Sequence, residues 1–314
     1  MKTTKEYLGI INSAIEKFEL PSRPERLYQP IIYALHGGGK RIRPVLMLSA
    51  TEASGADPQK AVAAALAVEM FHNFTLVHDD MMDRSALRRG RPTVYKKWNE
   101  STAILSGDAM LTLAHRLLSD MGTEINALFD ESAMKVYEGQ QYDMDFEERD
   151  DVTAEEYMRM IGLKTASLLA CAASMGALIA GRHDAAIAMY DYGYNLGIAF
   201  QLQDDYLDTF GTESTFGKPI GGDIVNRKKT WLLINAMEQK REKVDSIYST
   251  AYSPEDLIRK VKSLYYELGL DEQCMELIGC FTALAERALA KTGFDEEAIE
   301  FFRSLARKLV KRNK

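Results

Sequence analysis

Cysteine is scarce in this sequence, and its spacing offers no pairing. Three cysteines occur in 314 residues, at Cys171, Cys274 and Cys280, and no two of them form a CxxC pair. A disulfide framework needs paired cysteines and a structural zinc site needs closely spaced ones, so neither is indicated. The cysteines are therefore predicted to be reduced thiols of a cytoplasmic protein.

Proline and strand signals are also missing from long parts of the chain. All eight prolines lie outside residues 93–218, where apolar residues recur at spacings of three and four, a pattern typical of helices. Alternating β-branched segments with Asn-Gly or Asp-Gly turns are nearly absent. The sequence therefore predicts an all-α, multi-helix bundle. Because no Gly/Ser-rich or Pro-rich linker interrupts it, we expect a single domain over residues 1–314.

Neither positive charge nor long hydrophobic segments dominate the composition. The formal net charge is −7, whereas binding to nucleic acid phosphates favours a basic surface. The longest uncharged run, residues 165–181, is shorter than the roughly 20 residues that span a bilayer, and it predicts a buried helix. Residues 1–20 carry charges throughout and indicate an amphipathic helix rather than a secretory signal. We expect no nucleic acid partner and no integral membrane association.

What the sequence does contain is a concentration of aspartate. Asp79, Asp80 and Asp83 end an apolar stretch that is predicted to be helical from near Gln59. Asp79 and Asp83 then lie four residues apart on one helix face, where their charges repel. The simplest interpretation of one such DDxxD motif is a solvated acidic helix end.

A second motif of the same kind favours a functional interpretation. FQLQDDYLD places Asp204, Asp205 and Asp208 at the same spacing, again after an apolar helix. Magnesium prefers oxygen ligands and usually takes one or two carboxylates together with substrate phosphates. The two motifs therefore predict a site for two or more Mg²⁺ ions that hold a diphosphate. The calcium-loop pattern of EF-hands, with its central glycine, is absent.

Basic residues surround both motifs, and guanidinium groups bind phosphate oxygens in bidentate fashion. Surface pairing with a neighbouring acid is the simpler interpretation for Arg84 and Arg91. The glycines of HGGGKRIRP suit a loop that wraps an anion, although the Walker pattern is not met. The basic residues near the motifs are Arg84, Arg88, Arg89, Arg91, Lys40, Arg41, Arg43, Lys164, Lys218, Lys228 and Lys229.

From about Tyr28 to about Leu233 the chain resembles the trans-type isoprenyl diphosphate synthases, the polyprenyl synthetase family. The motifs that carry the resemblance are, in order, GGKRIRP, EMFHNF, DDMMD with LRRG, SGDAML, GQQYD, the Lys-Thr pair at 164 and 165, FQLQDDYLD, and GKPIGGDI followed by KKT. The resemblance implies an all-α isoprenoid-synthase bundle with a deep central cavity, usually a homodimer. It also implies head-to-tail condensation of isopentenyl diphosphate with an allylic diphosphate.

The resemblance further implies roles for individual residues. The ligands of the Mg²⁺ ions that clamp the allylic diphosphate are implied to be Asp79, Asp80, Asp83, Asp204, Asp205 and Asp208. Cations implied at that diphosphate are Arg88, Lys164 and Lys218, with Lys228 near a closing loop. The isopentenyl diphosphate site is implied at Lys40, Arg43, His72 and Arg89, although His72 also fits a core histidine. Thr165 and Gln201 are implied to turn oxygens toward the developing carbocation.

No nucleophilic side chain is needed for this chemistry. An allylic carbon–oxygen bond ionises when metal ions and fixed cations stabilise the leaving diphosphate in a site closed to water. The double bond of isopentenyl diphosphate then attacks the cation, and a proton is lost, with the departing diphosphate as the expected base. The absence of a Ser-His-Asp or Cys-His constellation is consistent with this scheme.

Product length is predicted from the residues just before the first motif. Phe74 lies five residues before Asp79, roughly 7–8 Å deeper along a helix. In the family an aromatic residue there tends to limit the product to fifteen or twenty carbons. Thr75 departs from the double-aromatic pattern of animal and fungal farnesyl synthases, and a geranylgeranyl-type product is favoured. Met110 and Leu113 are an alternative, deeper floor, and the alternative interpretation of Phe74 is simple core packing.

Other functions fit the sequence less well. A longer-chain polyprenyl synthase remains an alternative because product length rests on few residues. Class I terpene cyclases use a second metal motif like NDxxSxxxE, which FQLQDDYLD does not match. A non-catalytic subunit of a prenyl synthase would be expected to lack some of the aspartates or basic residues, and none is missing.

Overall fold

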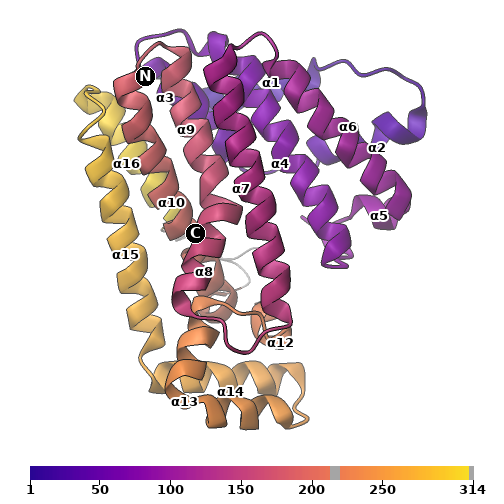
Figure 1. The fold of residues 1–314 in the computed structure, drawn as a ribbon, viewed down its shortest axis with the longest axis vertical. Helices are drawn as coiled ribbons and strands as arrows, with labels where there is room; N and C mark the ends of the chain where they lie inside the picture. The colour runs from indigo at the N-terminus through magenta and orange to yellow at the C-terminus, as the bar shows by residue number, and fades with distance from the viewer. Residues whose placement is uncertain (213–219, 311–314) are drawn as a thin grey trace. The chain divides into compact units, whose positions relative to one another are not determined.

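The computed structural model describes residues 1–212 and 220–310, and these are almost entirely helical (Figure 1). The prediction of an all-α protein is confirmed. The helices up to the first aspartate motif are α1 (Thr4–Glu16), α2 (Glu25–Leu35), α3 (Ile42–Ala53), the 3₁₀ turn η1 (Pro58–Ala61) and α4 (Val62–Met82). There follow the strands β1 (Leu87–Arg88) and β2 (Arg91–Pro92), then α5 (Val94–Lys97), α6 (Glu100–Leu118) and α7 (Thr123–Glu147).

The later helices include the second aspartate motif. They are α8 (Ala154–Ile161), the π-helical segment η2 (Gly162–Ala166), α9 (Ser167–Ile179), α10 (His183–Phe210), α12 (Gly222–Val225), α13 (Trp231–Ser249), α14 (Pro254–Glu267), α15 (Leu270–Leu289) and α16 (Glu296–Val310). The chain groups into two compact units, which are described separately. Unit 1 comprises Met1–Asp130 and Cys171–Ile187, and unit 2 comprises Glu131–Ala170 and Ala188–Lys314.

Helix α4 is the core of unit 1. It packs mainly against α6, with α2, α3 and α1 as further neighbours, and its apolar residues from Ala64 to Phe74 are largely buried. Asp57 caps the η1 turn by accepting from the backbone N–H of Gln59 at 2.9 Å. Pro58 is the first residue of that turn, a position whose backbone N–H would have no partner within the helix, so proline is tolerated there. This start agrees with the helix predicted from near Gln59. It fixes which residues of α4 share a helix face, up to the aspartates at its end.

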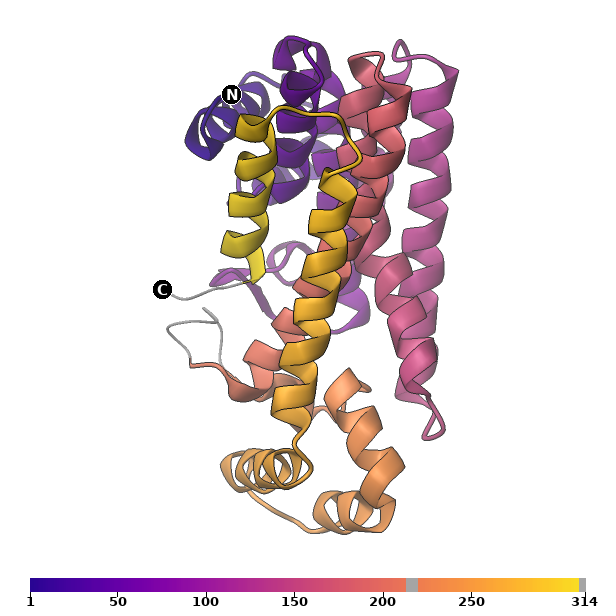
Figure 2. The ribbon, with the colours of Figure 1, turned by 90° about the vertical axis from the view of Figure 1, so that its left-hand side faces the viewer.

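In unit 2 the long helix α10 ends at the second aspartate motif. Helix α8 begins with a capping box, in which the Thr153 hydroxyl accepts from the N–H of Glu156 and the Glu156 carboxylate accepts from Thr153, and such reciprocal bonds fix a helix start. Helix α16 returns beside α15 (Figure 2). A buried bond from the Tyr192 hydroxyl to the Phe302 carbonyl, 2.8 Å long, ties α16 to α10.

Two helical stretches, Pro58–Met82 and Ala154–Ile179, are long and apolar enough to cross a membrane by length and composition. Most of each apolar window is buried in the fold, as in the core helices of many proteins. The uncharged run at 165–181 is thus a largely buried helix, as its composition predicts.

Two segments whose sequence lacks helical periodicity, residues 21–44 and 84–98, are only partly irregular in the structure. Residues 21–44 contain α2, which tolerates Pro30 at its centre, and residues 84–98 contain the hairpin of β1 and β2 and the single turn α5. The strands pair antiparallel, with Leu87 opposite Pro92 and Arg88 opposite Arg91. A hairpin of two residues on each side has too few residues to produce a period-two sequence signal, which is why the sequence did not predict it.

Candidate active site

The first aspartate motif lies at the C-terminal end of α4 in unit 1. Asp80 is 4% exposed, Asp79 is half-buried, and Asp83, the residue that follows the helix, is exposed. The N–H of Asp83 donates to the carbonyl of Asp79 at 2.8 Å, so the predicted i, i+4 relation holds. The motif therefore presents carboxylates at graded depth rather than as a uniformly solvated helix end.

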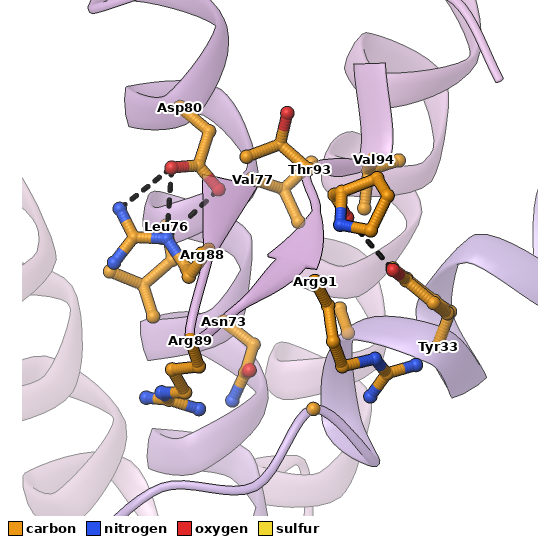
Figure 3. A pocket seen from close by; sticks show the side chains of 13 residues that line it. Tyr33, Asn73, Leu76, Val77, Asp80, Arg88, Arg89, Arg91, Thr93 and Val94 are labelled. Carbon is orange, nitrogen blue, oxygen red and sulfur yellow. Dashed lines mark hydrogen bonds and ion pairs between the residues drawn. The ribbon is translucent and has the colours of Figure 1, made fainter. Parts of the chain in front are cut away.

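The hairpin after the motif turns Arg88 back onto Asp80 (Figure 3). The Nε of Arg88 lies 2.9 Å from each oxygen of Asp80, and Nη2 lies 2.8 Å from Oδ1. Arg89 and Gly90 form the turn, with φ of 53° and 73°, as the favoured two-residue hairpin turn requires. Burial raises the pKa of Asp80, and the hydrogen bonds and charge of Arg88 oppose that shift.

A loop rich in glycine lies beside this hairpin, also in unit 1. Gly38 and Gly39 have φ of 77° and 128°, values that glycine adopts without steric cost. The Arg89 guanidinium donates to the Gly38 carbonyl. The loop therefore brings Lys40, which is exposed, into the same part of the unit as the arginines of the hairpin.

A buried ion pair fixes the end of this loop. Arg41 is 6% exposed, has φ of 47°, donates to the Leu35 carbonyl, and lies 2.5 Å from the carboxylate of Glu69. Asn73 donates to the same Glu69 carboxylate at 3.0 Å. The sequence predicted neither Glu69 nor this role of Arg41, because nothing in a linear pattern shows that a charge is buried.

Four arginines act electrostatically on His72. Burial lowers the pKa of His72 well below its usual value, and Arg43, Arg89, Arg88 and Arg41 lower it further. Burial also lowers the pKa of Arg43 to about 10, with Glu69 opposing the shift. Among the described residues the Nε of Arg43 is buried without a hydrogen-bond partner. A buried guanidinium N–H without a partner can bind an anion.

A pocket opens between α2, α4 and the hairpin (Figure 3). Asp80, Arg88, Arg89 and Arg91 line it beside apolar residues such as Val77. Arg91 donates to the His36 carbonyl at 3.1 Å and lies 4.0 Å over the ring of Tyr33. The predicted pairing of Arg91 with an acid is therefore wrong, because a backbone carbonyl and an aromatic face take its place.

Phe74 lies one turn and a half before Asp79 on α4, as predicted. It is 7% exposed and packs against Phe71 and against His78, whose ring centroids are 5.5 and 4.8 Å away. Thr75 is half-buried and its hydroxyl donates to the His72 carbonyl at 2.8 Å. On α6, Met110 is fully buried and Leu113 half-buried. Phe74 thus has core contacts, and its role in product length stays a prediction.

The second aspartate motif lies in unit 2 at the end of α10, with the first aspartate half-buried and the other two buried. Asp208 accepts from the N–H of Asp223 at 2.9 Å and its carbonyl accepts from the N–H of Gly221 at 2.7 Å. The GGDI segment is thereby held against the motif. Burial, with the nearby charge of Asp223, raises the pKa of Asp205 to about 7.

Two of the lysines predicted at the site, both in unit 2, lie close to the same carboxylate. Lys164 lies 2.6 Å and Lys228 lies 3.9 Å from the carboxylate of Asp143. Burial alone would raise the pKa of Asp143, but these two lysines outweigh it and the pKa is lowered. Lys218 lies outside the described residues. The sequence did not single out Asp143, although GQQYD contains it.

The π-helical segment η2 carries Lys164 and Thr165, and such segments occur often at functional sites. Gly139 on α7 permits their position, because a Cβ there would lie 2.3 Å from the backbone nitrogen of Lys164. The Thr165 hydroxyl donates to the side-chain oxygen of Gln201 at 2.9 Å. Thr165 and Gln201, which were predicted together, are therefore in contact.

The donor chemistry of the two motifs fits a magnesium ion. Within residues 1–212 and 220–310, no three Asp, Glu, His or Cys side chains are gathered into a complete ligand set. Mg²⁺ is usually bound by one or two carboxylates and completed by water and substrate phosphates, and each motif supplies carboxylates at a helix end. The carboxylates therefore fit Mg²⁺ that arrives with a diphosphate.

The comparison with known families agrees with these features. The polyprenyl synthetase family model matches residues 24–268, which is most of the chain and contains both aspartate motifs. The chain belongs to the polyprenyl synthetase family. The two DDxxD motifs, the glycine-rich loop and the hairpin arginines described above are thus features of a polyprenyl synthetase.

Similar proteins of this family are named for short-chain products. The chain is 42% identical to a geranylgeranyl diphosphate synthase of Methanosarcina mazei over 236 residues, which cover 73% of each sequence. A crystal structure of a geranylgeranyl pyrophosphate synthase matches the whole of both chains with a TM-score of 0.94 and 40% identity. A polyprenyl synthase of Caulobacter crescentus, complexed with calcium and isoprenyl diphosphate, matches 99% of this chain and 96% of its own, with a TM-score of 0.89 and 28% identity.

Proposed function

We propose that this polyprenyl synthetase condenses isopentenyl diphosphate head-to-tail with an allylic diphosphate to form a trans-prenyl diphosphate of twenty or fifteen carbons. The observation that carries the proposal is the positive environment around His72 beside the first aspartate motif. Arg43, Arg88 and Arg89 all act on it, and the Arg43 Nε has no partner in the described part of the chain. Relatives at about 40% identity that are named for geranylgeranyl diphosphate support the same product class.

In this proposal the aspartates hold two or more Mg²⁺ ions. The residues are Asp79, Asp80, Asp83, Asp204, Asp205 and Asp208. The bound ions would neutralise the charge of the allylic diphosphate and make it a better leaving group. Asp80 and Asp205 already accept hydrogen bonds, but a carboxylate has about four lone-pair sites and retains room for a metal. The similar polyprenyl synthase of Caulobacter crescentus is complexed with calcium, a divalent cation, and isoprenyl diphosphate, which supports this assignment.

The cations of the chain divide between the two substrates. Arg88, Lys164, Lys218 and Lys228 are proposed to bind the allylic diphosphate, and Lys40, Arg43, His72 and Arg89 to bind isopentenyl diphosphate. A guanidinium can bind phosphate with two parallel hydrogen bonds. His72 with a lowered pKa is neutral near pH 7, so it would bind phosphate by donating one ring N–H rather than through charge.

Thr165 and Gln201 are proposed to stabilise the carbocation. An oxygen lone pair that faces a developing cation lowers its energy without forming a covalent bond. We also propose that the chain acts as one domain, as a cytoplasmic homodimer, with no nucleic acid or integral membrane partner.

The test is a product analysis. Purified protein with Mg²⁺ and isopentenyl diphosphate is incubated separately with dimethylallyl, geranyl or farnesyl diphosphate, and mass spectrometry gives the chain lengths. Release of twenty- or fifteen-carbon diphosphates is expected. Much longer chains would retain the chemistry but reject the short-chain product, and a failure to elongate any primer would contradict the proposed function.

A further inference from the structure

Tyr157 belongs to none of the motifs, yet it lies in contact with one of them. It is on α8, one turn before the π-helical segment that carries Lys164 and Thr165, and it is 2% exposed. Its hydroxyl donates a hydrogen bond to Oδ2 of Asp205, the middle residue of the second aspartate motif. All of these residues belong to unit 2.

This bond is the first link of a continuous chain of hydrogen bonds. The other oxygen of Asp205, Oδ1, accepts from the Gln201 amide nitrogen at 2.9 Å. The Gln201 amide oxygen in turn accepts from the Thr165 hydroxyl at 2.9 Å. Tyr157 and Thr165 are therefore connected through Asp205 and Gln201, and each of the three bonds has one evident donor and one evident acceptor.

The chain determines which way the Gln201 amide faces. The NH₂ group of Gln201 donates to Oδ1 of Asp205, and a carboxylate oxygen accepts such a bond. The amide oxygen then faces the opposite side, toward Thr165. A glutamine that lacked this partner would have two nearly equivalent orientations, and only one of them presents the oxygen there.

The Tyr157 hydroxyl in turn fixes Asp205. Asp205 is 5% exposed, so an oxygen that loses its partner cannot readily be compensated by bulk water. The carboxylate would then rotate to recover a donor, and the amide of Gln201 would follow. The aromatic ring of Tyr157 does not supply this restraint; only the hydroxyl does.

We infer that Tyr157 is a positioning residue for prenyl transfer: through Asp205 it fixes the Gln201 amide so that the oxygens of Gln201 and Thr165 face the reacting allylic carbon. This inference rests on the proposed function, because it assigns a role within that reaction. Tyr157 itself touches no substrate in this scheme. Its effect is to hold the cation-facing groups in the orientation that the transition state needs.

The test compares Tyr157→Phe with Tyr192→Phe. Tyr192 is a matched control, because it is also a fully buried tyrosine of unit 2 whose hydroxyl donates to one acceptor, the Phe302 carbonyl. Both variants lose one buried hydroxyl and should lose similar thermal stability. Only Tyr157→Phe is expected to lower kcat, by roughly 10- to 100-fold, because small errors in the position of reacting groups have effects of this size.

Two further readouts separate positioning from a general loss of structure. KM for isopentenyl diphosphate should stay within about threefold, because the diphosphate-binding cations are unchanged. The ratio of prenyl alcohol to elongated product should rise, because a poorly stabilised cation is captured more often by water. In that side reaction water forms the new carbon–oxygen bond as the bond to diphosphate breaks, and the proton passes to the diphosphate.

A second variant covers the case in which Tyr157→Phe does not fold. In Asp205→Asn the new amide has one acceptor oxygen, so it accepts from Tyr157 and turns its NH₂ toward Gln201, which must then present its own oxygen to it. The amide of Gln201 is thereby reversed, and the alcohol ratio is expected to rise above that of Asp204→Asn, a variant that changes another proposed metal ligand of the same motif.

The outcomes are distinguishable. Suppose that the wild-type protein elongates, and that Tyr157→Phe and Tyr192→Phe have the same kcat and alcohol ratio. This result would overturn the role of Tyr157 and leave the proposed function standing. An alcohol ratio in Asp205→Asn no higher than that of Asp204→Asn would overturn the role of Tyr157 as well. A wild-type protein that does not elongate would overturn the proposed function, and the role of Tyr157 with it.

Discussion

At the scale of single residues, the aspartates within each motif lie in different environments. Asp80 is held by the Arg88 guanidinium, and Asp205 is held by Tyr157 and Gln201. Burial raises the pKa of both groups. The motif DDxxD thus contains residues in different environments, which its spacing does not reveal. The first aspartate of each motif, Asp79 or Asp204, is only half-buried and is the sharpest target for testing the metal site.

The first prediction concerns these two aspartates. Asp79→Ala and Asp204→Ala should each lower kcat by about 10²- to 10⁴-fold, because each removes a proposed metal ligand rather than a packing group. Circular dichroism should show an unchanged helix content. Near-normal turnover in both variants, measured by diphosphate release, would contradict the model in which both motifs hold metal.

A second residue-scale prediction concerns Phe74. Phe74→Ala should lengthen the product by at least one five-carbon unit, because it removes the aromatic ring proposed as the floor of the chain-binding region. It should also cost about 3–5 kcal/mol of stability as a large-to-small core change. Leu289→Ala, at a fully buried position of α15, is the control: it should lose stability without altering chain length. Identical products from both variants would place the floor elsewhere.

At the scale of elements, the glycine-rich loop is joined to α4 by the buried pair of Arg41 and Glu69. Arg41 precedes α3 in a left-handed backbone conformation. The contacts of its side chain, rather than backbone hydrogen bonding of a regular element, therefore hold the end of the loop in place. Removing one partner of a buried pair leaves the other charge without compensation. The loop and α4 should therefore lose stability together.

The third prediction follows from this pair. Arg41→Met should lower the free energy of unfolding by about 3–5 kcal/mol because Glu69 stays buried and unpaired. Lys243→Met is a suitable control, since it breaks an ion pair with Glu267 in which both side chains are about half exposed, and such exposed pairs contribute little to stability. Urea denaturation measures both. Equal effects would show that burial of the Arg41 pair adds nothing.

The packing of α7 on the π-helical segment supplies the fourth prediction. Gly139→Ala places a methyl group 2.3 Å from the backbone nitrogen of Lys164, so the segment must shift and kcat should fall by roughly tenfold or more. Gly279→Ala on α15 meets nothing within 4 Å and should instead stabilise by about 0.5–1 kcal/mol, since alanine favours helices. Full activity in Gly139→Ala would show that the close approach is not required.

At the scale of the whole molecule, each compact unit supplies one aspartate motif and its own cations. A ligand that binds only the folded protein stabilises it in proportion to the logarithm of its concentration.

The fifth prediction uses this linkage. Mg²⁺ together with inorganic diphosphate at about 100 times its Kd should stabilise the protein by about 2.7 kcal/mol, seen as a rise in melting temperature. Inorganic diphosphate with EDTA should give a clearly smaller rise, and EDTA should abolish turnover. The same comparison in Asp79→Ala is the control. A shift that persists unchanged with EDTA would show that the diphosphate binds without metal.

The sequence alone determined the helical class, the placement of α4 and α10, and the residue types at the ends of these helices. These features depend on local patterns: apolar residues at spacings of three and four, absent prolines, and two DDxxD motifs. Helical periodicity is set over a few turns, and it can therefore be read from neighbouring residues without knowledge of the fold.

Only the tertiary structure showed the contacts of Tyr157, Glu69 and Asp143, and the two-residue hairpin that turns Arg88 onto Asp80. Tyr157 and Asp205 are separated by 48 residues in sequence, and no local pattern relates them. Burial, which sets the cost of an unpaired charge and the direction of each pKa shift, arises only when distant segments exclude water together. The tertiary structure therefore decided how the predicted residues are held and which unpredicted residues hold them.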